Sequence, residues 1–174
     1  MFRHIDAGDR RLMLRLNRWH APRWVRRAML IATRAGDGWL WGMIGLVLLV
    51  FGGPHRFQAL VAGALAVISG QLTFRVLKRI IGRERPCATE PHVWPVLLPP
   101  DRFSFPSGHS ITAFAFATTL GLFYPALLAA LMFCALSVAA SRVILGLHYL
   151  SDVVAGTLIG ILIGTAAFEW MPHL

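Results

Sequence analysis

Apolar residues along the chain gather into five runs, at 39–51, 57–77, 108–124, 125–143 and 149–170. A helix needs about 20 predominantly apolar residues to cross the hydrocarbon core of a bilayer, and all runs except the first approach that length. Residues 82–106 form the one long polar segment, which is rich in proline and has no helical pattern. The pattern therefore predicts an all-α fold, a polytopic transmembrane helix bundle of about five spans.

The first apolar run is short for a membrane span. We expect this span to begin near Gly36, before the run itself. Trp39 and Trp41 would then anchor the helix at the interface between hydrocarbon and head groups, where tryptophan is enriched.

The last apolar run carries a ridge of small residues at four-residue spacing, Gly156, Gly160 and Gly164. Such a ridge lies along one face of a helix and lets a neighbouring helix approach closely. We interpret it as a packing surface, without a chemical role.

The residues before the first span predict two short basic helices. Residues 9–20 place leucines and a tryptophan on one face and arginines on another, and Pro22 suits the first turn of a second basic helix. We expect 1–35 to form an amphipathic arm that lies in the membrane interface, with a soluble arm as the alternative. Residues 36–174 would form the transmembrane core, and 1–174 a single domain.

Composition and charge support a membrane protein. Hydrophobic residues make up 56% of the chain and charged residues 14%, whereas soluble domains average about 25% charged. The net charge of +9 suggests nucleic-acid binding at first, but nine of the 17 lysines and arginines lie in residues 1–38. Basic residues beside spans set topology and attract anionic lipids, so we exclude nucleic acid as a partner. The two cysteines, Cys87 and Cys134, indicate neither a disulfide framework nor a zinc site.

Three polar clusters interrupt this apolar chain, at 78–86, 106–109 and 141–152. With five spans, all three fall on the same side of the membrane. Ionisable residues at membrane depth are expensive and are usually functional, so we expect the clusters to form one site. Arg79 and Arg83 are interpreted differently, as topology anchors at the end of the second span.

Each cluster has a physical interpretation. Ser107 is a favoured N-cap residue, and the free N–H groups of the helix that follows it attract anions near His109. His148 and Asp152 are four residues apart, so they would share a face of a helix. A carboxylate that holds one imidazole nitrogen leaves the other free as a nucleophile or base. The cationic side chains expected to bind phosphate oxygens are Lys78, Arg85 and Arg142.

These residues resemble the three signature motifs of the type 2 phosphatidic acid phosphatase superfamily. In family terms the motifs are K-x6-R-P, P-S-G-H and S-R-x5-H-x3-D, and every fixed position is present between residues 78 and 152. A three-part pattern at these spacings is far more specific than a single short motif. The superfamily also contains soluble vanadium haloperoxidases, and the apolar spans favour its membrane lipid phosphatases.

The resemblance implies a role for each residue. His148 would attack phosphorus and form a phosphohistidine, Asp152 would orient it, and His109 would protonate the leaving oxygen. The phosphoryl oxygens would be held by Lys78, Arg85, Ser107, the Gly108 N–H group and Arg142. Fixed cations and dipoles would stabilise the charge on these oxygens, so we expect neither a metal nor another cofactor.

The resemblance leaves the substrate open within a class of lipid phosphates. Family substrates include undecaprenyl pyrophosphate, phosphatidylglycerol phosphate, phosphatidic acid, lipid A 1-phosphate and phosphorylated polyprenyl sugars. We expect the residues that discriminate among them to lie on the helices and in 87–105. The alternative activity is a lipid-to-lipid phosphotransferase. A non-enzymatic scaffold is excluded by the complete set of motifs, and no pattern indicates an obligate protein partner.

Two indicators of orientation in a bacterial inner membrane disagree. The basic arm, together with Arg79, Arg83 and Arg102, lies on the active side, and only Arg56 lies on the other. The positive-inside rule then directs the active side to the cytoplasm. The resemblance instead suggests relatives whose active sites face outward. We expect the cytoplasmic orientation.

Overall fold

A computed structural model of the chain describes residues 2–19, 21–86 and 102–171. Its helices are α1 (Phe2–Arg18), α2 (Arg23–Arg34), α3 (Leu40–Phe51), α4 (Arg56–Ile81), α6 (Gly108–Phe123), α7 (Leu128–Ile144) and α8 (Leu150–Trp170). A π-helical turn, η1 (Ala35–Trp39), joins α2 to α3, and a 3₁₀ turn, η2 (Pro125–Leu127), precedes α7. The all-α fold is confirmed. Most of 87–105, where substrate discrimination was predicted, lies outside the described residues.

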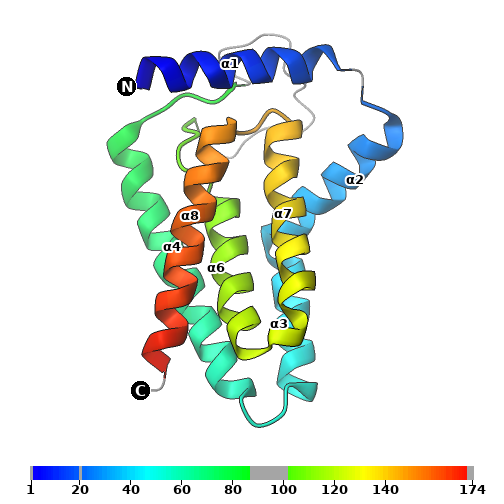
Figure 1. The fold of residues 1–174 in the computed structure, drawn as a ribbon, viewed down its shortest axis with the longest axis vertical. Helices are drawn as coiled ribbons and strands as arrows, with labels where there is room; N and C mark the ends of the chain where they lie inside the picture. The colour runs from blue at the N-terminus through cyan, green and yellow to red at the C-terminus, as the bar shows by residue number, and fades with distance from the viewer. Residues whose placement is uncertain (1, 20, 87–101, 172–174) are drawn as a thin grey trace.

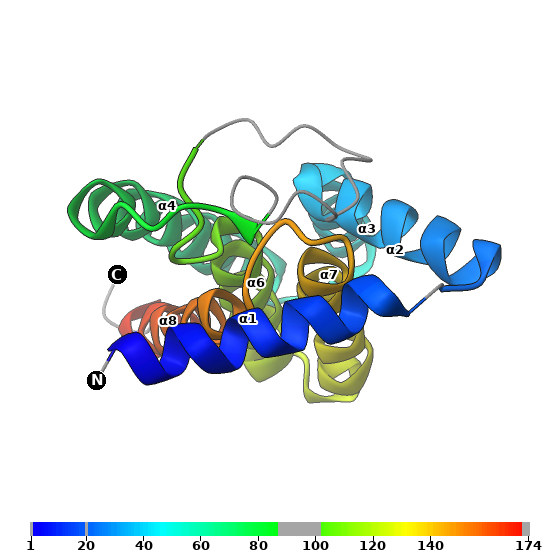
Figure 2. The same ribbon diagram turned by 90° about the horizontal axis from the view of Figure 1, so that it is seen from above.

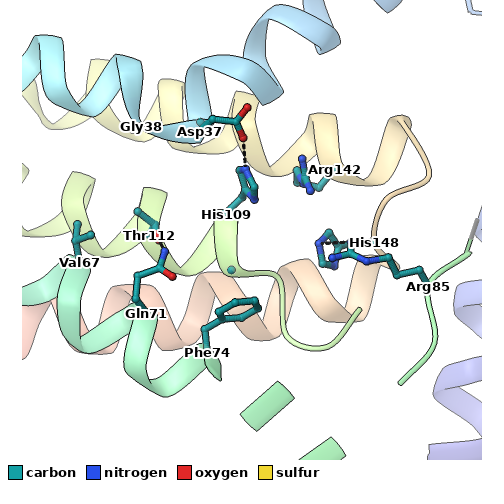
Figure 3. Close-up of a pocket in the computed structure, with 12 residues that line it drawn as sticks. Asp37, Gly38, Val67, Gln71, Phe74, Arg85, His109, Thr112, Arg142 and His148 are labelled. Atoms are coloured by element: carbon teal, nitrogen blue, oxygen red, sulfur yellow. Dashed lines mark hydrogen bonds and ion pairs between the residues drawn. The ribbon is translucent and has the colours of Figure 1, made fainter. Parts of the chain in front are cut away.

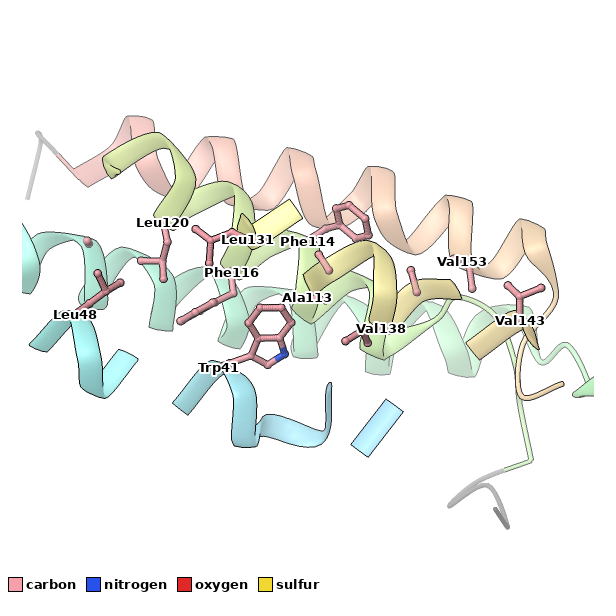
Figure 4. Close-up of a cluster of buried hydrophobic side chains, with 14 of the residues drawn as sticks. Trp41, Leu48, Ala113, Phe114, Phe116, Leu120, Leu131, Val138, Val143 and Val153 are labelled. Carbon is pink, nitrogen blue, oxygen red and sulfur yellow. The ribbon is translucent and has the colours of Figure 1, made fainter. Parts of the chain in front are cut away.

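Helix α6 runs through the centre of the bundle (Figure 1). It packs against α4, α7 and α8, and nearly all of its side chains are buried. The surrounding apolar core includes Trp41, Phe116, Leu120 and Val138 (Figure 4). Because α6 is enclosed by the other helices, its N-terminal turn is held at one end of the bundle, beside the starts and ends of its neighbours.

The predicted glycine ridge on α8 packs directly against α6. A Cβ atom added at Gly160 would lie 2.6 Å from the Ile111 carbonyl oxygen, and one at Gly164 would lie 2.6 Å from that of Ala115. Real Cβ atoms do not approach this closely, so no larger residue fits without moving the helices apart. The prediction of a packing surface is confirmed, and the close contact fixes the start of α8 beside the start of α6.

Four helical stretches of the described chain are long and apolar enough to cross a membrane: Arg23–Phe51, Arg56–Ile81, Pro125–Ile144 and Leu150–Trp170. Their outward faces expose large apolar side chains such as Leu46, Phe133 and Leu162, as expected beside lipid. The other predicted span, α6, has 16 residues and is shielded by its neighbours. The chain is therefore a multi-pass membrane helix bundle.

The first candidate span, Arg23–Phe51, extends to both sides of its predicted start near Gly36. The apolar helical stretch runs from Arg23 to Phe51, across the predicted boundary between arm and core at 35 and 36, with a kink at Gly38. In glycine-rich η1 the chain is kinked, because Gly38 has a non-helical φ of 126°, and α2 and α3 meet at this kink. The break in regular helix that these glycines suggested is present as this kink, and α2 on its N-terminal side is part of the same candidate span.

The two tryptophans of this span have different environments. Trp39 is 81% exposed, consistent with an interfacial anchor, whereas Trp41 is 5% exposed and its ring packs 5.5 Å from that of Phe116. The prediction for Trp41 was wrong. Residues two apart on a helix point in nearly opposite directions, so both could not face lipid.

Helix α1 lies across the end of the bundle that carries the three polar clusters (Figure 2). Its Asp9 and Met13 are buried against the bundle, while Arg11, Arg15 and Arg18 are exposed. The predicted amphipathic helix is present, and it is docked on the bundle instead of extending from it as a free arm.

Candidate active site

The three polar clusters meet around one cavity of about 370 Å³. It lies between η1, α4, the N-terminal turn of α6, the end of α7 and the loop before α8 (Figure 3). Five of the predicted site residues line it: Arg85, Gly108, His109, Arg142 and His148. Lys78, Ser107 and Asp152 are buried behind its wall.

His148 is held between Asp152 and Arg85. Its Nδ1 lies 3.6 Å from Asp152 Oδ2, and its Nε2 lies 3.0 Å from Arg85 Nη1. A guanidinium only donates hydrogen bonds, so Nε2 accepts and Nδ1 carries the proton that faces Asp152. The tautomer inferred from this contact directs the one lone pair of Nε2 at the Arg85 guanidinium, which also lines the cavity.

His148 and Asp152 lie close together, but by a different geometry from the one predicted from the sequence. The two residues do not share a helix face, because His148 lies in the loop before α8 and Tyr149 is the N-cap. Asp152 lies in the first turn of α8 and its Oδ2 accepts a 2.9 Å hydrogen bond from the Tyr149 N–H. The carboxylate thus folds back over the helix start, beside the histidine.

Burial decides the charge state of His148. Its side chain is 2% exposed, and this burial, with the positive charges of Arg85 and Arg142, lowers the pKa of His148 to about 4 against the opposing effect of Asp152. His148 is therefore neutral at pH 7, the form in which an imidazole nitrogen is a nucleophile.

Arg83 is not the topology anchor that the sequence suggested. Its side chain is 17% exposed and donates hydrogen bonds to Asp152 Oδ1 at 2.6 Å, Ser151 Oγ at 2.7 Å and Asp9 Oδ2 at 2.8 Å. Burial alone would lower the pKa of Arg83, but the hydrogen bonds to Asp9 and Asp152 outweigh it and raise the pKa. Arg83 stays charged and holds the second oxygen of Asp152.

Helix α1 reaches the same network through Asp9. The Asp9 carboxylate accepts hydrogen bonds from the Ser151 N–H group at 3.2 Å, from the Ser151 hydroxyl and from Arg83. Asp9 therefore satisfies one of the free N–H groups in the first turn of α8. Sequence reasoning missed this residue, because nothing in the pattern places α1 against α8.

His109 lies in the first turn of α6, and Ser107 is its N-cap, as the sequence predicted. The Ser107 hydroxyl accepts hydrogen bonds from the Ser110 N–H at 3.4 Å and the Ser110 hydroxyl at 2.9 Å. The Ser107 N–H donates to the Asp152 carbonyl at 3.0 Å, which joins the second cluster to the third. The binding of phosphate by Ser107 stays a prediction.

The His109 ring is hydrogen-bonded to a residue that sequence reasoning missed. Its Nε2 lies 2.7 Å from Oδ1 of Asp37, in η1 (Figure 3). The sequence did contain a signal for Asp37: it is a single carboxylate within the first membrane span, and ionisable residues at membrane depth are usually functional.

The predicted phosphate-binding residues differ in how they meet the cavity. Arg85 Nη1 donates to the Leu147 carbonyl at 2.8 Å and Arg142 Nη1 to the Thr33 hydroxyl at 2.5 Å, so both guanidinium groups are held in the wall. A Cβ at Gly108 would lie 3.1 Å from the Phe74 ring, which favours glycine there. The Lys78 amine lies 4.5 Å above the same ring. Phosphate binding by Lys78 stays a prediction.

The cavity combines an imidazole lone pair, two fixed guanidinium groups, a helix N-terminus and a second histidine. This combination suits nucleophilic displacement at an anionic centre such as phosphorus, with cations and dipoles already in place for the charge that develops. In the described part of the chain no three histidine, cysteine or carboxylate side chains gather as a metal site would require.

The chain is similar in sequence to one known protein family and to characterised phosphatases. The model of the PAP2 superfamily matches residues 59–174. A lipid A 1-phosphatase of Rhizobium etli is 40% identical over 98 residues, which are 54% of this chain and 42% of that protein. A decaprenylphosphoryl-5-phosphoribose phosphatase of Mycobacterium tuberculosis is 33% identical over 132 residues, 73% of this chain and 68% of that protein. The match thus spans less than half of the Rhizobium relative.

Two solved structures share the fold. The transmembrane PAP2-type phosphatidylglycerolphosphate phosphatase of Bacillus subtilis superposes with a TM-score of 0.74 at 24% identity, over 98% of this chain and 88% of that one. LpxE of Aquifex aeolicus gives the same TM-score and identity, over 91% and 93%.

Proposed function

Because the chain belongs to the PAP2 superfamily, we propose that it is a membrane-embedded phosphatase that removes phosphate from a lipid through a phosphohistidine on His148. The observation that carries the proposal is the state of His148. It is buried and neutral, its Nε2 is on the cavity side next to Arg85, and Asp152 lies behind its other nitrogen.

In the first half-reaction Arg85 exchanges its hydrogen bond to His148 Nε2 for one to a phosphoryl oxygen, Nε2 attacks phosphorus, and the bond between phosphorus and the leaving oxygen breaks. His109, protonated, gives its proton to the leaving oxygen, so a lipid alcohol departs from a phosphomonoester and a lipid monophosphate from a pyrophosphate. Asp152, whose Oδ2 lies 3.6 Å from Nδ1, stabilises the positive charge on the ring of His148. Arg85 and Arg142 stabilise the phosphoryl oxygens.

In the second half-reaction a water molecule attacks the phosphohistidine. His109, now neutral, takes a proton from this water as the oxygen–phosphorus bond forms and the nitrogen–phosphorus bond breaks. Inorganic phosphate leaves, and both histidines return to their starting forms. If an acceptor alcohol replaced water, the same chemistry would be a phosphotransfer.

The shape of the cavity supports a lipid substrate. Beyond the phosphate-binding residues it continues past Phe74 and Gln71 to Val67, along α4 toward the bilayer centre. From Phe74 to Val67 this is about 10 Å at the rise of an α-helix. A phosphate attached to a membrane lipid would bring its first carbon atoms into this part of the cavity. Candidates are undecaprenyl pyrophosphate, phosphatidylglycerol phosphate, phosphatidic acid, lipid A 1-phosphate and phosphorylated polyprenyl sugars.

A panel of these lipid phosphates, assayed one at a time in detergent with EDTA present, tests the proposal. We expect free phosphate from at least one lipid without added metal, because Arg85, Arg142 and the start of α6 supply the charge stabilisation. Transfer to a second lipid without free phosphate would identify a phosphotransferase. Activity that EDTA abolishes and one divalent ion restores would contradict the metal-free mechanism.

We expect the active end to face the cytoplasm of a bacterial inner membrane. The arginines of α1 and α2 lie at or near that end, whereas Arg56 begins α4 at the other end. Each basic residue near an anionic leaflet gains about 1 kcal/mol. A reporter that is active only in the cytoplasm, fused after α8, should then be silent. A strong signal would place His109 and His148 in the periplasm and favour undecaprenyl pyrophosphate as the substrate.

A further inference from the structure

Asp37 is a carboxylate placed inside the first membrane-spanning stretch, Arg23–Phe51. It lies on the π-helical turn η1, between Gly36 and Gly38, and it lines the catalytic cavity. The helix is kinked here, because the neighbouring Gly38 has a non-helical φ of 126°. The distortion here turns one carboxylate toward the cavity, on the side of α6 where His109 lies (Figure 3).

The side chain of Asp37 contacts a catalytic candidate, His109. Among the described residues its hydrogen bond goes to His109 Nε2, at 2.7 Å. Gly36 keeps the contact close, because a Cβ there would lie 2.6 Å from a methyl group of Val138 and 3.4 Å from the His109 ring. The carboxylate does not cap a neighbouring helix, because the N-terminus of α2 and that of α3 have no side-chain cap hydrogen bond.

A carboxylate in a phosphate site is unfavourable on electrostatic grounds, because it repels the substrate. Arg85 and Arg142 line the same cavity, and their charges disfavour a third cation on His109. A carboxylate next to His109 opposes this effect, and the pair of Asp37 with protonated His109 carries no net charge toward the phosphate. The position of Asp37 is therefore explained by a need for protonated His109.

We propose that Asp37 is a positioning residue that orients the His109 ring and stabilises its protonated form for transfer of a proton to the leaving oxygen. This inference rests on the proposed phosphatase function. Asp37 itself keeps its charge throughout. The proton moves from His109 to the lipid oxygen as that oxygen leaves phosphorus, and a proton from water restores His109 in the second half-reaction. The site then contains two carboxylate–histidine pairs, one for the nucleophile and one for the acid.

Substrates with different leaving groups distinguish a role of Asp37 in proton transfer from a purely structural role. An alkyl alcohol leaves poorly without a proton, whereas p-nitrophenol leaves readily as an anion. We expect Asp37→Asn to lower kcat about 10- to 100-fold with the best lipid phosphate of the panel, within the range assigned to general acid catalysis. With p-nitrophenyl phosphate the loss should be less than about threefold. Asp37→Glu, which keeps the charge, should recover part of the lipid activity.

The matched control is Glu169→Gln, which neutralises an exposed carboxylate at the far end of α8 and should leave both rates unchanged. Equal losses of Asp37→Asn on both substrates would mean that the substitution only disturbs the fold, and would overturn the inference. Unchanged rates on both would overturn it as well.

A second measurement does not depend on activity. In protein labelled with ¹⁵N-histidine, we expect the His109 ring to carry its proton on Nε2 in the wild type and to lose part of that population in Asp37→Asn. An unchanged His109 signal would show that the carboxylate does not control the ring. A wild type that releases no phosphate from any lipid, but shows this change, would overturn the proposed function and leave the pairing intact.

Discussion

Alanine in place of His148 is expected to abolish phosphate release, with a fall in kcat of about 10⁴- to 10⁶-fold, as when other enzymes lose a nucleophile. No other described group meets the cavity as His148 does, with a buried neutral ring and a lone pair beside Arg85. The measurement is phosphate release in detergent, with rapid quenching of a ³²P-labelled lipid to trap the intermediate. The label should appear on the wild type and be absent from His148→Ala.

Asp152→Asn is the companion variant. The carboxylate orients His148 without replacing it, so this protein should fold and keep weak activity, about 10²- to 10⁴-fold below the wild type. Asparagine keeps an oxygen for the Tyr149 N–H but loses the charge that faces Arg83. Label trapped on the His148→Ala protein would assign the nucleophile to another residue and refute the mechanism.

The second large effect is expected at His109. Its replacement by alanine should lower kcat about 10²- to 10⁴-fold on a lipid phosphate, because the alcohol then leaves without a proton. The pH profile of the wild type provides the independent check. We expect kcat/KM to be bell-shaped, with an acid limb from His148 and an alkaline limb from His109.

The acid limb follows from the buried state of His148. The neutral ring is the nucleophile, so activity is full above the pKa of about 4 and falls as the pH drops through that value. Because the two histidines share one cavity, the measured limbs belong to the pair. In His109→Ala the alkaline limb should disappear while the acid limb stays. A wild-type profile that is flat from acid to alkaline pH, with chemistry rate-limiting, would contradict both roles.

Much of the site's chemistry was accessible without the fold. His109, His148 and Arg142 were identified from motif spacing, and the cavity brings them together. The prediction of a packing ridge on α8 was also correct, because residues four apart lie on the same face of a helix whatever the tertiary structure. The glycines at η1 correctly indicated a break in regular helix, because Gly38 adopts a φ of 126° that few other residues can adopt.

By itself, the sequence determined that this protein is a membrane helix bundle of the PAP2 superfamily, with its polar motif residues at one end. Excess apolar surface requires lipid, and short spacings set which groups share a turn. Only the tertiary structure decided which groups meet across the bundle: Asp37 with His109, and Asp9 with Arg83. Partners more than 70 residues apart depend on how helices rotate and pack, and one residue of shift turns a helix by about 100°. The local sequence pattern does not show how each helix is rotated against its neighbours.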